Sequence, residues 1–453
     1  MFDREEEMDR YLDEIKDMLR RKQYAAVRDL LLPLEPPDIA MLLEESGEEF
    51  MPLLYRLLPK ELAAEVFVEL ESDSQEMLIN GFSNTELKEV LDELYLDDAV
   101  DIVEEMPASV VIRILDKATP EMRKSINEML QYPEDSAGSI MNVEYLSLKK
   151  DMTVADAFKR IRRIGGELET INILYVTDPT RHLQGVLSVR DLLLADEDDR
   201  IEEIMDPNVV SVTTLDDKED VAQAMSKYDY LAMPVVDQEN RLIGIVTVDD
   251  AMDVMEEEAT EDMEKMAAIT PTDKPYLKTS VRSTFQARIP WLLLLMVSAT
   301  FTGLIITSFE NSLAVLPVLT AYIPMLMDTG GNCGSQSSTL IIRGIALNQV
   351  TFHDFFRVIW KEFRVSLIVG VVLAVANGLR IYLTYQQAGM AVVIALSLVA
   401  TVISAKLLGC ILPMCAKKIG LDPALMASPL ITTIVDASSI MIYFFIATKV
   451  FHL

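Results

Sequence analysis

Two polar stretches interrupt an otherwise apolar C-terminal region, and their residue types could bind a cation. The first runs from Pro324 to Thr339 and contains the carboxylate of Asp328 and the run Gly330-Gly331-Asn332. The second runs from Pro429 to Asp436 and ends on a carboxylate. Polar side chains in segments of membrane-spanning length must face protein or water rather than lipid. We therefore interpret the two stretches as the walls of a cation pathway.

Asp436 has the most direct means of binding a cation in this region. It lies near the middle of an expected span, where a charge that faces lipid costs about 2.5 kcal/mol or more. Hydroxyl side chains lie on adjacent helical turns, at Thr432, Thr433, Ser438 and Ser439. Pro429 frees backbone carbonyls upstream of the carboxylate. The alternative is a structural carboxylate paired with Arg380 or Lys406.

The first stretch supplies the other wall of the expected pathway. Gly330 and Gly331 permit either an unwound backbone or close helix packing. Asn332 and Gln336 lie on one helical face, and Asp328 adds a carboxylate beside them. We expect these five residues, together with Ser428 and Pro429 of the second stretch, to line the pathway.

The ligand types favour a hard cation. No histidine lies in an expected span, and the three cysteines, Cys333, Cys410 and Cys415, have neither zinc nor disulfide spacing. Soft and borderline metals would therefore lack suitable ligands. Mg²⁺ sheds its water reluctantly and is typically held by one or two carboxylates with waters retained. One aspartate per chain among hydroxyls and carbonyls matches that preference.

Charge divides the chain into two unlike parts. The 453 residues carry a net charge of −32, of which residues 1–270 contribute −38 and residues 271–453 contribute +6. A charge of −38 repels phosphate and disfavours nucleic acid as a partner, whereas cations are natural ligands. The N-terminus lacks the basic and apolar regions of a signal peptide, so we expect a cytoplasmic N-terminal part.

Residues 1–133 have the spacing of short amphipathic helices. Five polar or proline-containing helix starts recur in this part: Pro36-Pro37-Asp38, Pro59-Lys60-Glu61, Asn84-Thr85-Glu86, Leu96-Asp97-Asp98 and Thr119-Pro120-Glu121. Each could begin a helix through an N-cap or a proline in the first turn. Short helices that bury each other's apolar faces predict an acidic, all-helical superhelical domain.

An internal duplication follows, which we divide into residues 134–200 and 201–262. The run Gly185–Asp191 returns as Gly244–Asp250, and further matches occur at two other places in register. The predicted β-α-β-β-α order resembles a tandem pair of CBS domains. In such pairs the cleft between the repeats often holds an adenine nucleotide. The candidate nucleotide-binding residues are Ser188, Asp191, Thr247 and Asp250; an empty cleft is the alternative.

A charged connecting helix is expected at residues 263–287, before a membrane domain at residues 288–453. Five spans are expected at about 290–308, 313–340, 365–386, 390–414 and 427–449, each near the ~20 residues that a bilayer requires. Basic residues precede the first span and follow the second and fourth, whereas the other two loops carry none. This asymmetry predicts a cytoplasmic N-terminus and an external C-terminus.

These features together resemble the MgtE family of magnesium transporters. The motifs Pro-x-x-x-x-x-Gly-Gly-Asn-x-Gly-x-Gln, from Pro324, and Asp-Pro-Ala-x-x-x-x-Pro-x-x-x-x-x-x-Asp, from Asp422, carry the resemblance, which covers essentially the whole chain. It implies a homodimeric Mg²⁺ channel in a lipid bilayer. It also implies that Asp436 and the Thr432 carbonyl bind the ion, with Asp422 at the cytoplasmic mouth. Ser428 stands where relatives can carry asparagine.

The resemblance further implies regulatory Mg²⁺ sites, and ATP in the CBS cleft of some members. The matching acids in the N-terminal domain are Glu65, Asp97 and Asp101. Those in the CBS pair and connecting helix are Asp229, Asp250, Glu258, Glu261 and Asp262.

We therefore expect a multidomain protein with an all-α N-terminal domain, an α/β tandem CBS pair, a connecting helix and a five-helix transmembrane domain. The expected function is Mg²⁺ uptake across the plasma membrane, gated by intracellular Mg²⁺, with no enzymatic activity and no dedicated protein partner. An ion-coupled divalent-cation exchanger and a non-conducting, membrane-anchored nucleotide sensor remain open alternatives. An ATP-driven pump is disfavoured because the sequence has neither a phosphate-binding Gly-x-x-x-x-Gly-Lys-Ser/Thr loop nor an Asp-Lys-Thr-Gly phosphorylation site.

Overall fold

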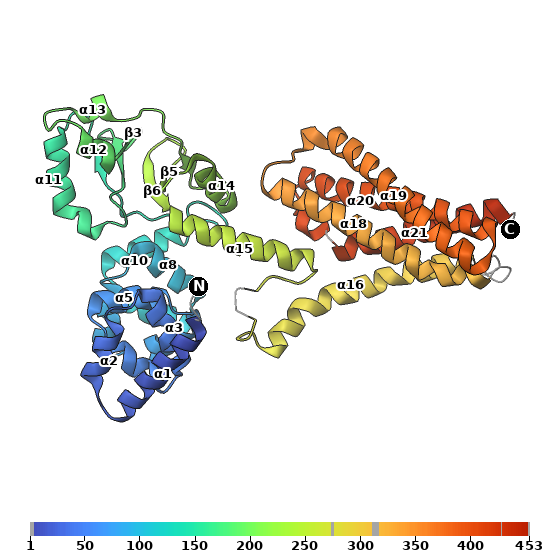
Figure 1. The fold of residues 1–453 in the computed structure, drawn as a ribbon. Coiled ribbons are helices and arrows are strands. Elements are labelled where there is room, and N and C mark those ends of the chain that lie inside the picture. Colours follow the sequence, from blue (N-terminus) through green and yellow to red (C-terminus); the bar gives the residue numbers. More distant parts are fainter. Residues whose placement is uncertain (1–3, 273–275, 310–316, 427, 452–453) are drawn as a thin grey trace. The chain divides into compact units, whose positions relative to one another are not determined.

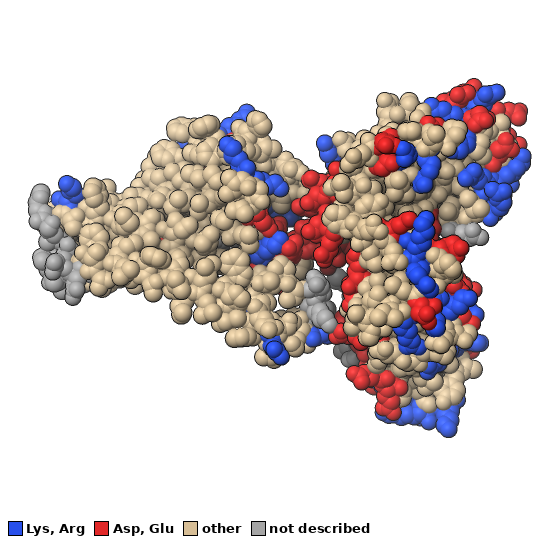
Figure 2. Space-filling view, turned by 180° about the vertical axis from the view of Figure 1, so that it is seen from behind, with Lys and Arg blue, Asp and Glu red and all other residues tan. Residues whose placement is uncertain are grey.

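The computed structural model of the chain describes residues 4–272, 276–309, 317–426 and 428–451 (Figure 1). The chain divides into two compact units, Met1–Met255 and Glu256–Leu453. The surfaces of the two units differ in composition. Figure 2 shows Asp and Glu side chains spread over the first unit, whereas the second is covered mostly by uncharged residues.

The N-terminal domain of the first unit consists of ten helices. They are α1 (Arg4–Arg20), α2 (Tyr24–Leu31), α3 (Pro36–Ser46), α4 (Met51–Tyr55), α5 (Lys60–Val68), α6 (Ser72–Gly81), α7 (Asn84–Leu91), α8 (Leu96–Glu105), α9 (Ala108–Lys117) and α10 (Pro120–Met129). Helices α1, α3, α5, α7 and α9 pack one on the next, as in a helical repeat.

The five predicted helix starts are confirmed, because α3, α5, α7, α8 and α10 begin at them. Ser83 and Glu86 form a capping box at the start of α7, in which Ser83 Oγ accepts from the backbone N–H of Glu86 at 3.2 Å. Thr119 caps α10 in the same way, and Pro120 follows in the first turn. Side-chain caps therefore set the starts of α7 and α10, and prolines lie at the starts of α3 and α5, whereas α8 begins after Tyr95 without a side-chain cap.

The CBS pair has the predicted repeated order of elements. The first repeat contains β1 (Ser147–Leu148), α11 (Val154–Ile164), the 3-10 helix η1 (Gly165–Glu167), β2 (Ile173–Thr177), β3 (Leu183–Ser188) and α12 (Val189–Leu194). The second contains α13 (Ile201–Ile204), β4 (Val212–Thr213), α14 (Lys218–Tyr228), β5 (Ala232–Val236), β6 (Leu242–Thr247) and the start of α15 (Val248–Met266).

Each repeat has a three-stranded sheet with the same topology. The first strand is parallel to the second, which is antiparallel to the third, giving the orders β1-β2-β3 and β4-β5-β6. The registers also match, since Ile173 pairs with Ser188 in one sheet and Ala232 with Thr247 in the other. The sheets therefore confirm the duplication.

The N-terminal domain and the second CBS repeat share one apolar core. This core contains Val100 of α8 and Ile126 of α10 together with Val221, Met233 and Val246 of the second repeat. The first repeat has its own core around Leu174 and Leu192. This shared core holds α8 against the second repeat. The contact positions the acidic residues described below.

The connecting helix lies earlier in the chain than expected. Helix α15 extends from the second CBS repeat to Met266, and α16 (Val281–Ser308) begins after the N-cap Ser280. Ala268 adopts a left-handed conformation (φ 55°) just after α15. The expected helix at 263–287 is therefore wrong, since it covers the end of α15, residues 267–272 and 276–280, which are not helical, and the start of α16.

The second unit contains long helices. After α16 come the 3-10 helix η2 (Pro317–Tyr322), α18 (Ile323–Ala346), η3 (Phe352–Asp354), α19 (Phe355–Tyr385), α20 (Ala388–Lys418), η4 (Pro423–Met426) and α21 (Ser428–Phe451). Helix α20 packs against α18, α19 and α21, while α18 and α21 also pack against each other and α16 packs against α21 (Figure 1).

Four segments of the described chain are long and apolar enough to span a membrane. They are Val281–Ser308, Phe352–Tyr385, Ala388–Lys418 and Pro423–Phe451. The remaining expected span corresponds to α18, whose 24 residues would extend about 36 Å. Helix α18 is not among the four apolar segments because its polar stretch lowers its hydropathy. The expected start of this span, at residue 313, lies outside the described residues. The count of five therefore depends on α18.

The helices extend further than the expected spans. Helix α19 starts at Phe355 rather than 365, so the run Lys361-Glu362-Phe363-Arg364 is helical rather than a loop. The other helices also begin before or end after the apolar runs. Charged residues at the ends of these helices need not interrupt the backbone hydrogen bonds, so composition alone places the boundaries too far inward.

Candidate functional site

Glycines of α18 and α20 bring three helices of the second unit into close contact. A Cβ atom added at Gly330 would lie 2.8 Å from Val435 Cγ1, and one at Gly331 would collide with Thr432 Cγ2. One added at Gly409 of α20 would collide with the backbone of Gly334. Close packing is therefore what the Gly-Gly pair provides, and α18 is continuous through it, so the alternative of an unwound backbone is wrong.

Asp436 lies at this contact and has a buried carboxylate oxygen. Its Oδ1 atom is buried and has no partner among the described residues, and the same holds for Ser439 Oγ one turn later and Thr401 Oγ1 on α20. Asp328 lies close enough for its carboxylate to repel that of Asp436. Buried polar atoms are almost always paired in folded proteins. The unpaired oxygens are therefore suited to water or a cation.

The alternative partner Lys406 is occupied elsewhere. Its ammonium donates to Ser337 Oγ at 3.2 Å and lies 4.0 Å from Glu362 Oε2, and Ser337 Oγ donates to the same carboxylate oxygen at 2.8 Å. The exposed fractions are 5% for Lys406, 9% for Glu362 and 1% for Ser337. Among the described residues, neither Lys406 nor Arg380 forms an ion pair with Asp436. The interpretation of Asp436 as a structural carboxylate paired with one of these bases is wrong.

The polar face of α18 is exposed in the single chain. Asp328, Asn332 and Gln336 follow one another at intervals of four residues, and all three are exposed. They therefore form one stripe along the helix. Pro429 is partly buried in the first turn of α21. Ser428 begins this helix, and its side chain lies outside the described part of the structure.

A lysine bridges two of the predicted metal-binding acids at the end of α15. Lys265 Nζ lies 2.5 Å from Glu261 Oε1 and 2.8 Å from Asp422 Oδ2. Asp422 Oδ1 accepts from the backbone N–H of Ala424 at 2.7 Å. Partial burial lowers the pKa of Lys265, but hydrogen bonds to Asp422 and Glu261 outweigh it and raise that pKa overall. A resident ammonium therefore lies between these two carboxylates.

The neighbouring Asp262 has a different environment. Burial, followed by repulsion from Asp422, raises the pKa of Asp262 above its ordinary value. Met266 packs against Ile342 and Ala424, so the apolar side of this helix end contacts α18 and η4. The end of α15 thus contacts the residues next to the start of α21.

An acidic cluster, which we define as Asp97, Asp98, Asp101, Glu144, Glu169 and Asp250, lies within the first unit. Asn142 holds two of its members, since its Nδ2 donates to Asp97 Oδ2 at 2.9 Å and to Glu169 Oε2 at 3.2 Å. The Glu144 carboxylate accepts from the backbone N–H of Leu96 at 3.2 Å, at the start of α8.

Burial raises the pKa of every member of the acidic cluster, and repulsion between carboxylates adds to this for every member except Glu144. The pKa rises to about 7 for Asp98, about 8 for Asp101, about 8 for Glu169 and about 6 for Asp250, with burial as the largest cause and neighbouring carboxylates next. Burial also raises the pKa of Asp97 and Glu144. The cluster is electrostatically unfavourable when fully ionised, so bound protons or cations would stabilise it.

The other predicted regulatory acids lie outside this cluster. Glu65 is exposed on α5, and Asp229 is exposed with a left-handed backbone (φ 54°) at the end of α14. Glu258 is half-buried in α15. In the described ranges, no three His, Cys, Asp or Glu side chains are arranged so that they could hold a metal ion as they stand.

The sequence interpretation missed several residues that the structure brings to these sites. Asp98, Glu144 and Glu169 join the acidic cluster, Lys265 bridges Glu261 and Asp422, and Glu362 pairs with Lys406. Asp98 could have been found, because it directly follows Asp97 at a helix start. Glu144 and Glu169 come from loops of the first CBS repeat, and no local pattern indicates that they approach α8.

The candidate nucleotide-binding residues form the same structure in both repeats. Ser188 Oγ donates to Asp191 Oδ2 at 2.5 Å and accepts from the backbone N–H of Asp191 at 3.1 Å, which caps α12. Thr247 Oγ1 donates to Asp250 Oδ2 at 2.5 Å at the start of α15. Both pairs therefore have a capping role, and Asp250 also belongs to the acidic cluster.

Models of known protein families match four segments of the chain. Residues 323–446 match the MgtE divalent cation transporter model, residues 34–135 match the MgtE intracellular N domain, and residues 137–198 and 201–257 each match a CBS domain.

Two solved structures resemble about half of this chain. The cytosolic domain of the Mg²⁺ channel MgtE, crystallised in complex with ATP, is 38% identical with a TM-score of 0.51, covering 54% of this chain and 99% of that one. The soluble part of a magnesium transporter is 33% identical with a TM-score of 0.52, covering 56% of this chain and 99% of that one.

Two relatives match along nearly their whole length. The chain is 34% identical over 439 residues to the magnesium transporter MgtE of Bacillus subtilis, covering 96% of both. It is 38% identical over 437 residues to the magnesium transporter MgtE of Thermus thermophilus, covering 96% of this chain and 97% of that one. Identity of this extent, across the N domain, the CBS pair and the membrane helices, shows that the chain belongs to the MgtE family of divalent cation transporters.

Proposed function

We propose that this chain conducts Mg²⁺ across the membrane along a path lined by α18 and α21. The observation that carries the proposal is the buried Oδ1 of Asp436, which has no hydrogen-bonding partner among the described residues and lies in a helix of membrane-spanning length. The base Lys406, the alternative partner, is paired with Glu362. The names of the two relatives support Mg²⁺ as the ion. Asp436 would attract the ion, and the carbonyl of Thr432 would bind its retained water molecules.

We further propose that the path lies between two copies of the chain. The stripe formed by Asp328, Asn332 and Gln336 is exposed in the single chain, and a stripe of this polarity is costly if it faces lipid. Pairing two copies around a two-fold axis would turn both stripes toward a shared aqueous path. Cross-linking through a cysteine at Asn332 in native membranes would test this arrangement.

The cytosolic residues suit control of the path by Mg²⁺ on the same side. The carboxylates of the acidic cluster repel one another, and Asp422, Glu261 and Asp262 gather at the end of α15. Binding of Mg²⁺ at such groups would relieve repulsion and favour a closed arrangement. A change from 1:99 to 99:1 requires about 5.5 kcal/mol of differential binding, which a few sites could supply.

ATP is proposed as a ligand of the CBS pair. A similar cytosolic domain was crystallised with ATP. The Ser188–Asp191 and Thr247–Asp250 pairs present carboxylates, which commonly accept hydrogen bonds from ribose hydroxyls. The residues present therefore fit the sugar of a nucleotide, and its phosphates would need to avoid the acidic cluster around Asp250.

Flux measurements on the full chain in proteoliposomes test the proposal. We expect Asp436→Asn to lower Mg²⁺ uptake at least about tenfold. A tenfold decrease corresponds to the loss of about 1.4 kcal/mol of stabilisation of the ion at the barrier to permeation. Asp354→Asn is the matched control, since that carboxylate accepts from Thr351 at 3.0 Å and Arg357 at 3.4 Å outside the pathway. Unchanged uptake in Asp436→Asn would refute the assignment.

The same preparation separates the alternatives. A dependence of Mg²⁺ uptake on an imposed proton or sodium gradient would indicate an exchanger. The absence of flux from residues 271–453 alone, together with nucleotide binding by the full chain, would indicate a non-conducting sensor.

A cytoplasmic N-terminus and an external C-terminus remain part of the proposal. Cysteines placed at the two ends would test this orientation, through their accessibility to reagents from each side of the membrane.

A further inference from the structure

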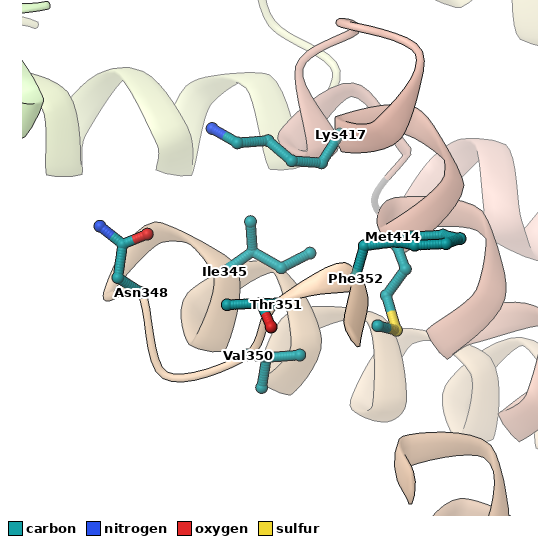
Figure 3. Close-up of a pocket in the computed structure, with 7 residues that line it drawn as sticks. All are labelled: Ile345, Asn348, Val350, Thr351, Phe352, Met414 and Lys417. Carbon is teal, nitrogen blue, oxygen red and sulfur yellow. The ribbon is translucent and has the colours of Figure 1, made fainter. Parts of the chain in front are cut away.

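A cavity of about 160 Å³ lies where the loop after α18 meets the end of α20 (Figure 3). It is lined by Ile345, Asn348, Val350, Thr351, Phe352, Met414 and Lys417. The volume is well above the ~15 Å³ that a single water requires, so the cavity has room for a small polar group. None of the lining residues belongs to the pathway or to the acidic cluster.

The cavity has an apolar floor and a polar rim. Ile345, Val350 and Met414 supply aliphatic or thioether surface, whereas Lys417 and Asn348 supply nitrogen donors. Figure 3 shows the nitrogen ends of Lys417 and Asn348 on the same side of the cavity, beyond Ile345. This arrangement suits a ligand with an anionic end and an apolar end.

Positive charge dominates the rim. Among the described residues, Lys417 has no carboxylate partner, and Lys418 lies 4.0 Å from the ring centroid of Phe352, which also lines the cavity. Asp354 is the nearby acid in the sequence, and it already accepts hydrogen bonds from Thr351 and Arg357. The rim is therefore electrostatically complementary to an anion.

The chain forms this cavity by a specific ending of α18. Asn348 adopts a left-handed conformation (φ 52°), and its N–H donates to the Ile345 carbonyl at 3.0 Å. The N–H of Val350 donates to the Gly344 carbonyl at 2.9 Å, and a Cβ added at Gly344 would lie 2.9 Å from Val350 Cγ2. The loop is thus folded back onto the helix by backbone hydrogen bonds, so the cavity is preformed.

We propose that this cavity binds the phosphate of an anionic phospholipid. Lys417 and Asn348 would hold the phosphate, and the glycerol and first acyl carbons would cover Ile345, Val350 and Met414. The cavity lies at the ends of membrane helices next to a cluster of bases, where anionic headgroups concentrate. A free phosphate ion would leave the apolar floor exposed to water, so the amphipathic lipid is the occupant that fits both parts.

Native mass spectrometry of the purified full chain, titrated with phosphatidylglycerol or phosphatidylcholine, tests the proposal. We expect phosphatidylglycerol to bind more tightly, and Lys417→Gln to weaken it about fivefold, the effect of one lysine near a membrane surface. Asn348→Asp should also weaken binding, because aspartate tolerates the left-handed backbone and adds a negative charge. Lys417→Arg should retain it.

The control is Lys449→Gln, which removes an exposed lysine at the far end of α21, where Lys449 lies 6.0 Å from the Phe445 ring centroid. Equal weakening by Lys449→Gln would overturn the proposal, because binding would then follow net charge rather than this site. Unchanged binding in both Lys417→Gln and Asn348→Asp would also overturn it. Displacement of the lipid by equimolar inorganic phosphate would show a free-anion site instead.

Discussion

Two carboxylates within the membrane helices, Glu362 and Asp436, have opposite electrostatic environments. Glu362 has a resident cation in Lys406 at 4.0 Å and a hydrogen bond from Ser337. Asp436 has another carboxylate, Asp328, nearby and an oxygen without a partner among the described residues. A carboxylate with an internal partner has little need of another ion. Of these two carboxylates, Asp436 is therefore the one available to a passing cation.

The buried pair makes a prediction about stability. Lys406→Met leaves the Glu362 carboxylate buried without its base, and breaking a buried pair costs about 3–5 kcal/mol. We expect a lower midpoint of thermal unfolding in detergent for Lys406→Met, and substantial recovery in the Lys406→Met, Glu362→Leu double variant. If the double variant were as unstable as the sum of the single variants, the pair would not be coupled.

The sequence identified Asp436 as a candidate cation ligand but did not indicate that Glu362 pairs with Lys406. Asp436 is conspicuous because it is a lone carboxylate in an apolar run. Glu362 lies in the run Lys361-Glu362-Phe363-Arg364, whose composition is typical of a loop at the membrane surface. The helical period exposes Lys361 and Arg364 and buries Glu362, and only a helix that already includes this run reveals the difference.

Among the elements, α15 is the one that both units share, because the division between them falls at Met255 and Glu256. Its end is held by Lys265, which bridges Glu261 and Asp422. This ammonium occupies a position that the resemblance would give to a metal ion. In the proposed control by Mg²⁺, the end of α15 would therefore already contact the residues that precede α21 before any ion binds.

The bridge predicts a shift in regulation. Lys265→Met leaves the carboxylates of Glu261 and Asp422 facing each other, and repulsion between such partly exposed groups amounts to about 1 kcal/mol. We expect higher Mg²⁺ flux when Mg²⁺ is absent from the cytoplasmic side, and about fivefold more Mg²⁺ for half-inhibition. Lys227→Met, at a lysine over the ring of Tyr228, is the control. An unaltered midpoint in Lys265→Met would show that the bridge has no part in closure.

Element boundaries followed from the sequence where local chemistry sets them. Proline and capping residues located five helices of the N-terminal domain, and the duplicated motif located both CBS sheets. The connecting helix was misplaced because it is a continuation of the last CBS helix, which begins at Val248 after the Thr247–Asp250 pair. The expected start at 263 therefore falls inside α15 rather than at the beginning of a separate helix.

In the molecule as a whole, carboxylates are concentrated in the first unit, and the repulsion between them opposes folding. The net charge is −32, and in the acidic cluster burial, followed by repulsion from neighbouring carboxylates, raises the pKa of Asp101 and Glu169. Distant segments form this cluster, which explains why no local pattern indicated Glu144 or Glu169, whereas the resemblance indicated Asp97 and Asp101 of α8. Their proximity to α8 depends on the tertiary contact between the N-terminal domain and the CBS pair.

The raised pKa values predict how stability depends on pH. The ordinary pKa of an Asp is 3.8, whereas the pKa of Asp250 is about 6 and that of Asp101 about 8 in the folded unit. The folded state therefore binds protons more tightly, so stability is greatest at low pH and falls as pH rises from about 4 to about 8. The Asp250 shift alone corresponds to about 3 kcal/mol.

Urea unfolding of residues 1–266, which approximate the solved cytosolic domains, measures this dependence. We expect lower stability at about pH 8 than at about pH 5 without divalent ions, and recovery at about pH 8 when Mg²⁺ binds the folded state. Asp101→Asn should reduce the slope, whereas Asp156→Asn, at an exposed carboxylate paired with Lys159, should not. Stability that rises over this interval would contradict the assigned burial of the cluster.

The glycine contacts of the second unit have a consequence for how this protein could be altered. Gly330, Gly331, Gly334 and Gly409 leave too little space for even one methyl group beside Val435, Thr432 and the opposing backbone. Main-chain atoms set the approach of α20 to α18 at Gly409 and Gly334, whereas the side chains of Thr432 and Val435 fill the space between α18 and α21. Engineering of the proposed ion preference should thus begin with the polar stripe on α18, because a larger residue at any of these glycines would displace a helix.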